Sequence, residues 1–273
     1  MKANLRLVFT IPIFFLCFYG FSQDSFWKTS NIKNEKVSNS LKKLSVKQAK
    51  VYTLDESSFK KDIEDVSKSL SSNKIVYFPD ESGNILAFKV VEASIFSSEL
   101  AQKYPQIKSY KGVGVNDPSK KIRFSISQNG LQSMLVDKNK SEATFMQKTT
   151  SGNYILYSRK SDEEVDKNFI CATIETISTE KSSVKTAKLA EDQILRKYRV
   201  AISATGEYTQ YHGGTKADAL AAINATLTRI NMVFETDLAI TLELVANTDA
   251  VIYTNAATDP YTGNLNTQAQ STF

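Results

Sequence analysis

Histidine and cysteine are nearly absent from this sequence, which has one histidine, His212, and two cysteines, Cys17 and Cys171, among 273 residues. A zinc-binding helix of the form H-E-x-x-H needs two histidines, so one histidine excludes it. The G-x-S-x-G motif that carries the serine of one class of Ser-His-Asp triads is absent as well. The run GVG (112–114) lacks the third glycine of a dinucleotide-binding turn, and GGTK (213–216) lacks the spacing of a phosphate loop. These residues therefore hold no complete catalytic motif.

Long apolar runs are also absent, except near the start of the chain. Residues 7–21 are continuously apolar and follow a short basic stretch, and the small residues Gly20 and Ser22 stand at −3 and −1 before Gln23. The run falls short of the ~20 residues of a membrane span. This pattern predicts a signal peptide over residues 1–22, cleaved before Gln23, rather than an uncleaved anchor. A lipoprotein signal at Cys17 is rejected because Leu16 stands where a small residue is required. We expect a secreted protein without a membrane partner after signal cleavage.

The excess of positive over negative charge is modest as well. Residues 196–273 contain 5 Lys and Arg against 7 Asp and Glu, although the whole chain has a formal charge of +5. The lysines of the preceding residues are scattered among serines and are not interleaved with aromatic side chains on which bases could stack. We therefore expect no nucleic-acid partner.

What the sequence does contain is a change of pattern along its length. Residues 23–73 form a polar segment with a short amphipathic helix at 58–70. Residues 74–177 are predicted to be a β-rich antiparallel domain with a short helix at 97–104. Its clearest hairpin is 121–137, where Asn129-Gly130 favours a type I′ turn.

The polar, lysine-rich residues 178–195 are predicted to be a linker between two units. Residues 196–273 then show a strand at 197–204, a helix beginning at Thr215, a parallel strand at 238–245 and a further strand at 251–254. Strand, helix and parallel strand make one βαβ unit, which is too little for a complete α/β domain because a parallel sheet is covered on both faces. The predicted class is α+β, a β-rich antiparallel domain followed by an incomplete α/β start.

Three stretches carry a resemblance to a known family: TGEY with HGGT (205–215), INATLTRINMVFETDLAITLELV (223–245) and YTN with DPYT (253–262). With them, residues 195–255 resemble the opening of the catalytic domain of secreted bacterial reprolysin-like zinc metalloproteases, in the metzincin class. Residues 88–127 are similar to the propeptide region of the same precursors. The resemblance implies a metzincin-like catalytic domain preceded by an inhibitory or chaperoning propeptide.

The resemblance further implies a zinc cofactor, protein or peptide substrates, and a propeptide that packs on the catalytic domain. The zinc helix of the family, with three histidines and a glutamate, would lie beyond residue 273. We therefore expect these residues alone to bind no zinc and to be inactive. Activation would follow cleavage of the linker near 185–196, unless the linker is an ordinary tether.

Two residues have competing interpretations. Cys171 would be a zinc ligand if the propeptide keeps the enzyme latent through a cysteine thiolate, as metzincin propeptides often do. Alternatively, it is a small hydrophobe of the sheet core, since Ile170 and Ala172 flank it. His212 has no partner at ligand spacing and is expected to be a structural turn residue.

A second function class remains open from the residues alone. A secreted β-rich binding or protease-inhibitor module without catalytic activity would have the same composition and the same antiparallel sheet. An H-E-x-x-H-x-x-G-x-x-H motif further along the reading frame would identify the protease.

Overall fold

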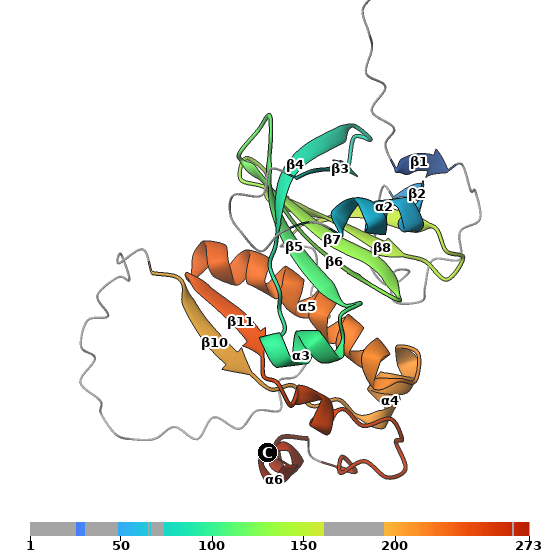
Figure 1. Ribbon diagram of the computed structural model, residues 1–273, viewed down its shortest axis with the longest axis vertical. Helices are drawn as coiled ribbons and strands as arrows, with labels where there is room; N and C mark the ends of the chain where they lie inside the picture. Colours follow the sequence, from blue (N-terminus) through green and yellow to red (C-terminus); the bar gives the residue numbers. More distant parts are fainter. Residues whose placement is uncertain are drawn as a thin grey trace, which may run out of the picture.

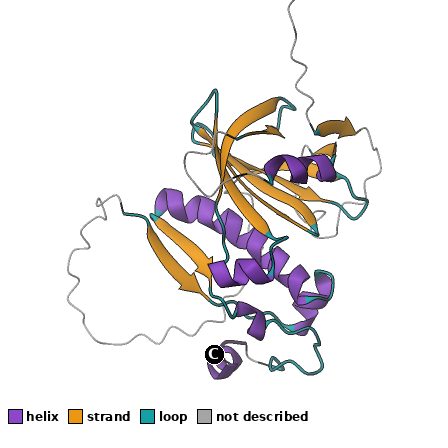
Figure 2. Ribbon diagram, viewed as in Figure 1, coloured by secondary structure: helices purple, strands orange, loops and turns teal. Residues whose placement is uncertain are grey.

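The computed structural model of the chain describes residues 26–30, 49–64, 66, 74–160, 194–263 and 265–272. Within them, the chain forms a nine-stranded antiparallel sheet, a two-stranded parallel sheet, and helices between and beside these sheets (Figures 1 and 2). The expected signal peptide, Cys171 and nearly all of the expected linker lie outside this part of the chain. None of the helices described is both long enough and apolar enough to cross a membrane.

The large sheet has the strand order β1-β2-β9-β8-β7-β6-β5-β4-β3, so most of its neighbours are also consecutive in sequence. Its strands are β1 (Trp27–Ser30), β2 (Lys50–Leu54), β3 (Ile75–Pro79), β4 (Ile85–Glu92), β5 (Lys108–Gly114), β6 (Lys120–Ser127), β7 (Gly130–Asp137), β8 (Glu142–Lys148) and β9 (Tyr154–Lys160). The short helix α3 (Ser98–Lys103) lies between β4 and β5. The β-rich antiparallel pattern predicted for this region is confirmed, as are the hairpin at 121–137 and the short helix.

Strands β1 and β2 come from the segment that the sequence analysis described as polar, and they lie at one end of the same sheet (Figure 1). Helix α2 (Glu56–Ile63) follows β2 and begins and ends earlier than the helix predicted at 58–70. Its Phe59 is fully buried against Trp27 and Phe78, in a core of aromatic rings on one face of the sheet. Sparse apolar residues in a polar segment are sufficient to build strands when each one is a large ring that enters this core.

The turn between β6 and β7 corrects one prediction. A type I′ turn requires a positive φ at both central residues. In the described part of the chain, Ala239 is the only residue other than glycine with a positive φ, so Asn129 does not meet this requirement. Within this turn, only Gly130 has a positive φ, of 95°. A glycine at this position opens the second strand without a Cβ clash.

The second unit consists of β10 (Arg196–Val200), α4 (Gly206–Tyr211), α5 (Lys216–Asp237), β11 (Ile240–Leu244), the 3-10 helix η1 (Thr248–Val251) and α6 (Leu265–Thr272). Strands β10 and β11, which α5 connects in sequence, pair directly and in parallel. The predicted βαβ unit is therefore confirmed. Thr215 and Asp218 form the predicted capping box at the start of α5. Of the strand expected at 251–254, only one bridge is present, between Ile252 and Ala204. That prediction is wrong because Asn247 and Asp249 favour a tight turn there.

Helix α5 lies between the large sheet and the β10–β11 pair (Figure 1). Leu220, Ile223 and Leu227 are at most 5% exposed and belong to a core that includes Leu244 of β11. Each of these side chains contributes about 1.5–3 kcal/mol through its burial. The opposite side of the helix contacts β5, β6 and β7, so α5 is packed on two sides, while Thr226 and Val233 remain exposed.

Asn231 joins α5 to β11 through the backbone of Leu242. Its Nδ2 donates to the Leu242 carbonyl at 2.9 Å, and its Oδ1 accepts from the Leu242 N–H at 2.9 Å. Asn231 is 1% exposed, so both hydrogen bonds are made away from water, where an unmade bond costs most. The asparagine thus takes the place that a neighbouring strand would occupy beside Leu242.

Candidate functional site

The stretch 205–214, which opened the family resemblance, folds as the short helix α4 and a glycine turn that leads into α5. Thr205 caps α4 by accepting a hydrogen bond from the Tyr208 N–H at 3.2 Å. Gly213 and Gly214 both have positive φ values, 131° and 92°, which other residues rarely adopt. This turn therefore depends on its glycines, and it fixes where α5 begins.

Gly206 connects this turn to the segment DPYT further along the chain. Its N–H donates to Asp259 Oδ2 at 2.7 Å, while Asp259 Oδ1 accepts from the Tyr261 N–H at 2.9 Å. A Cβ on Gly206 would lie 2.1 Å from the backbone nitrogen of Ala256, so no side chain fits there. Two of the quoted stretches, TGEY and YTN with DPYT, are therefore parts of one contact.

His212 is the C-cap residue of α4, and its backbone N–H donates to the carbonyls of Tyr208 and Thr209. Its ring lies 4.5 Å from the ring centre of Tyr208 and 4.9 Å from that of Tyr211. Burial lowers the pKa of the imidazole, and the nearby Asp218 carboxylate opposes this effect. The position is that of the structural turn residue expected from the sequence.

The described residues contain no group of three or more histidine, cysteine, aspartate or glutamate side chains that would hold a metal ion. His212 has aromatic rings on two sides, and Cys171 lies outside the described part of the chain. The described residues therefore contain no ligand set that fits the zinc site implied by the family resemblance.

The two units meet along a polar face of α5. Ser109 of β5 donates from Oγ to Asn224 Oδ1 at 3.0 Å, and its Oγ lies 2.9 Å from Thr228 Oγ1. All three side chains are at most 2% exposed. Near the start of α5, Gln128 of the β6–β7 turn donates to Asp218 at 3.1 Å. This hydrogen-bonded face positions α5 against the sheet in a single register.

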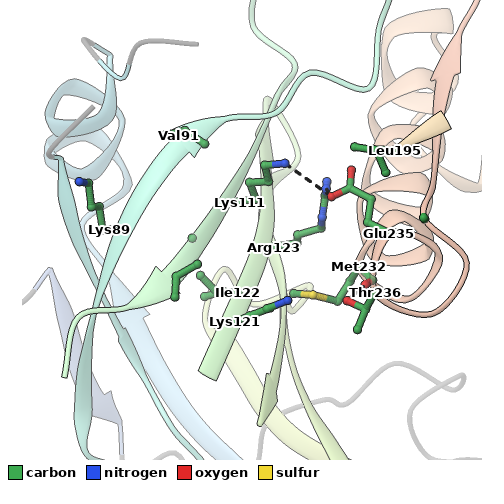
Figure 3. Close-up of a pocket in the computed structure, with 13 residues that line it drawn as sticks. Lys89, Val91, Lys111, Lys121, Ile122, Arg123, Leu195, Met232, Glu235 and Thr236 are labelled. Atoms are coloured by element: carbon green, nitrogen blue, oxygen red, sulfur yellow. Dashed lines mark hydrogen bonds and ion pairs between the residues drawn. The ribbon is translucent and has the colours of Figure 1, made fainter. Parts of the chain in front are cut away.

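Near the end of α5 the same contact becomes ionic and borders a cavity of about 640 Å³ (Figure 3). Arg123 and Lys111 both point toward Glu235, at 2.5 Å and 3.5 Å between nitrogen and oxygen. Only 3% of the Arg123 side chain is exposed, so this guanidinium depends on Glu235 for its compensating charge. Lys89 and Lys121 also line the cavity, which leaves an excess of positive charge at its walls.

The pKa of Glu235 reflects these neighbours. Burial acts to raise it, but the charges of Arg123 and Lys111, together with hydrogen bonds from Arg123 and Thr241, lower it below the ordinary value of 4.5. Glu235 therefore stays ionised at neutral pH. The cluster can hold two segments of chain together through opposite charges.

The comparisons agree with the resemblance inferred from the sequence. Residues 195–273 match the family described as metallo-peptidase family M12B, reprolysin-like. This segment, which contains β10, α5, β11 and the Gly206–Asp259 contact, is thus similar to reprolysin-like metallopeptidases. No match to the chain is found among curated proteins.

Sequence reasoning missed the contact residues of α5. A signal was present: Asn224, Thr228, Asn231 and Glu235 recur every three or four positions beside the apolar stripe. Such a polar stripe is usually a solvated helix face. Here it is covered. Asn224, Thr228 and Glu235 meet polar side chains of the large sheet. Asn231 meets the backbone of β11.

We expect Gly206→Ala to destabilise the protein by about 3 kcal/mol, because the new Cβ would overlap the backbone of residues 255 and 256. The measurement is the free energy of unfolding in denaturant. Gly263→Ala is the matched control, since a Cβ there approaches nothing closer than 4.0 Å. Equal stability of the two variants would contradict this account of the turn.

We expect Glu235→Gln to lower the free energy of unfolding at pH 7 by about 2–3 kcal/mol, because Arg123 loses its charged partner. The folded-state pKa of Glu235 is lowered, so its contribution is present above the unfolded pKa and is lost as pH falls through the folded one. The gap between variant and parent should therefore close in acid.

Denaturant midpoints at pH 7 and pH 3 measure this gap. Glu243→Gln is the control, because Glu243 pairs with Lys197, whose side chain is 57% exposed. A gap for Glu235→Gln that is the same at both pH values would refute the ion-pair account.

Proposed function

We propose that the chain is the precursor segment of a secreted zinc-dependent endopeptidase. In this proposal residues 1–22 direct export, residues 74–177 act as a propeptide, and residues 196–273 open the catalytic domain. The protein's substrates would be proteins or peptides, cleaved in the full-length enzyme at a zinc ion held by residues outside these 273.

The observation that carries the proposal is the match of residues 195–273 to the reprolysin-like family, together with the geometry of its motifs. Gly206, Asp259 and Asn231 are placed by contacts that require those residue types. The stretches that carry the resemblance thus have structural reasons to be present. They build the first βαβ unit, on which further strands and a metal site would depend.

A propeptide role for the large sheet is supported by its contact with α5. One face of β5, β6 and β7 contacts the helix. Ser109 pairs with Asn224, and Arg123 pairs with Glu235. Gln132 pairs with Arg229. Interfaces between partners that later separate are generally less hydrophobic than permanent ones. This polar contact suits a segment that first supports a domain and is later removed.

The zinc ion must be held elsewhere in the full-length protein. The family resemblance implies three histidine ligands, whereas the sequence contains one histidine, whose ring contacts those of Tyr208 and Tyr211. The contribution of this chain to the enzyme is therefore architectural: it positions α5 and β11. No chemical step is assigned to its residues.

The test extends the reading frame past residue 273. We expect a motif H-E-x-x-H-x-x-G-x-x-H, and the longer protein should cleave an unstructured protein substrate with activity lost to a zinc chelator and restored by zinc. The 273-residue chain is the control and should show no cleavage. Cleavage by the short chain, or a longer protein without the motif, would contradict the proposal. The second of these results would favour the secreted binding or inhibitor module.

Cys171 enters the proposal as a candidate latency ligand, on the chemistry of a thiolate that occupies the open position of zinc. We expect Cys171→Ala in the uncleaved longer precursor to raise its proteolytic activity, because the open position of zinc would no longer be occupied by a thiolate. Cys171→Ser would control for the size of the side chain. Unchanged latency in the alanine variant would identify Cys171 as a packing residue.

A further inference from the structure

The connection between β4 and β5 is much longer than the strands require. These strands are antiparallel neighbours, and such pairs are usually joined by loops of about 2–5 residues. Here residues 93–107, which we call the arm, carry α3 and extend to the second unit, beside β11 (Figure 1). The arm is thus longer than the sheet needs, and its additional residues contact the second unit.

The arm adds to the outer edge of β11. The Leu244 N–H donates to the Ile95 carbonyl at 2.7 Å, and the Ser97 N–H donates to the Leu244 carbonyl at 2.9 Å. Phe96 and Leu244 form a parallel bridge. Leu242, two residues earlier, already has its backbone groups paired with Asn231. The arm and Asn231 together satisfy the edge of β11 opposite β10.

The side chains of the arm complete the core of the second unit. Ile95, Phe96, Leu100 and Ile107 are at most 4% exposed, and they pack with a group that α5 and β11 supply. That group includes Ala219, Leu220, Ile223, Leu227 and Leu244. The second unit without the arm would expose an apolar patch and an unpaired strand edge, both of which are unfavourable in water.

A polar rim surrounds this apolar contact. Lys103 forms an ion pair with Asp249 of η1 at 3.3 Å, and the Tyr104 hydroxyl donates to the same carboxylate at 3.3 Å. Burial, and then the charge of Asp249, raise the pKa of Tyr104, so it remains a donor at neutral pH. An apolar centre with a charged rim is the anatomy of a stable interface between separate chains.

We propose that the arm is a noncovalent anchor that keeps the β-rich unit bound to the reprolysin-like segment after the chain between them has been cut. Linker cleavage alone then yields a two-chain complex, and release of the β-rich unit requires a second event that removes the arm. The partner that the β11 edge recognises is an extended apolar strand, Ile95-Phe96, followed by a short amphipathic helix. The term propeptide rests on the proposed function, but the association itself needs neither zinc nor activity.

The experiment inserts a site for a sequence-specific protease into residues 178–193, cuts the purified full chain there, and measures the size of the product at decreasing micromolar concentrations. Both cysteines precede the cut, so no disulfide can join the fragments. We expect the two fragments to elute together. Separate elution at micromolar concentration would overturn the proposal.

The decisive variant is Phe96→Asp, which places a carboxylate where the parent side chain is 3% exposed. We expect the concentration at which the cut fragments separate to rise by more than about 10-fold, because the carboxylate must be desolvated for the arm to bind. Val115→Asp is the matched control, since Val115 follows β5 and is 46% exposed. Its fragments should stay together as in the parent.

Folding of each variant is monitored through Trp27, the only tryptophan, which is buried in the large sheet away from the arm. If Phe96→Asp loses the Trp27 signal, the milder Phe96→Ala and Ile107→Ala take its place and should weaken association in the same direction. Folded variants whose fragments remain as tightly bound as the parent would overturn the role of the arm. Such a result would leave the protease proposal intact, because that proposal depends on the zinc motif.

Discussion

The packing of α5 against two sheets at once is the constraint on which the rest of the structure depends. One side of the helix places Leu220, Ile223 and Leu227 on β11 and the arm. The other places Asn224 and Thr228 on the large sheet. A helix with neighbours on both sides cannot shift along one without losing contacts on the other. The βαβ unit and the nine-stranded sheet are therefore parts of one packed structure.

The two sides of α5 are chemically different, and the difference matches the proposed life history of the protein. The side facing the large sheet is polar and ionic, and it includes the ion pair of Arg123 with Glu235. The side facing β11 is apolar and is completed by Ile95 and Phe96 of the arm. A precursor that must first hold and later release a domain needs both kinds of contact. In this proposal the arm is the anchor and the polar face fixes the orientation of α5.

Much of the local structure could be predicted from the sequence, because local rules determine it. The hairpins, the βαβ unit and the Thr215–Asp218 capping box follow from periodicity and end signals. The contacts between units could not be predicted. Ser109, Arg123 and Ser125 alternate with apolar residues and indicate a solvated sheet face, yet each is at most 4% exposed. A buried polar face can be told from a solvated one only when the element that covers it is known. The conformation of the turn at Asn129 was likewise not predicted correctly from the local sequence.

Amide hydrogen exchange of the intact chain tests this account most directly. The account predicts that amides in the middle of α5, such as Leu227, exchange with the same opening free energy as amides of β6, such as Phe124. Both should respond equally to added denaturant, because the two elements open in one cooperative event. Exchange of α5 at a clearly lower opening free energy, while β6 stays protected, would contradict the claim that one helix holds both sheets in a single structure.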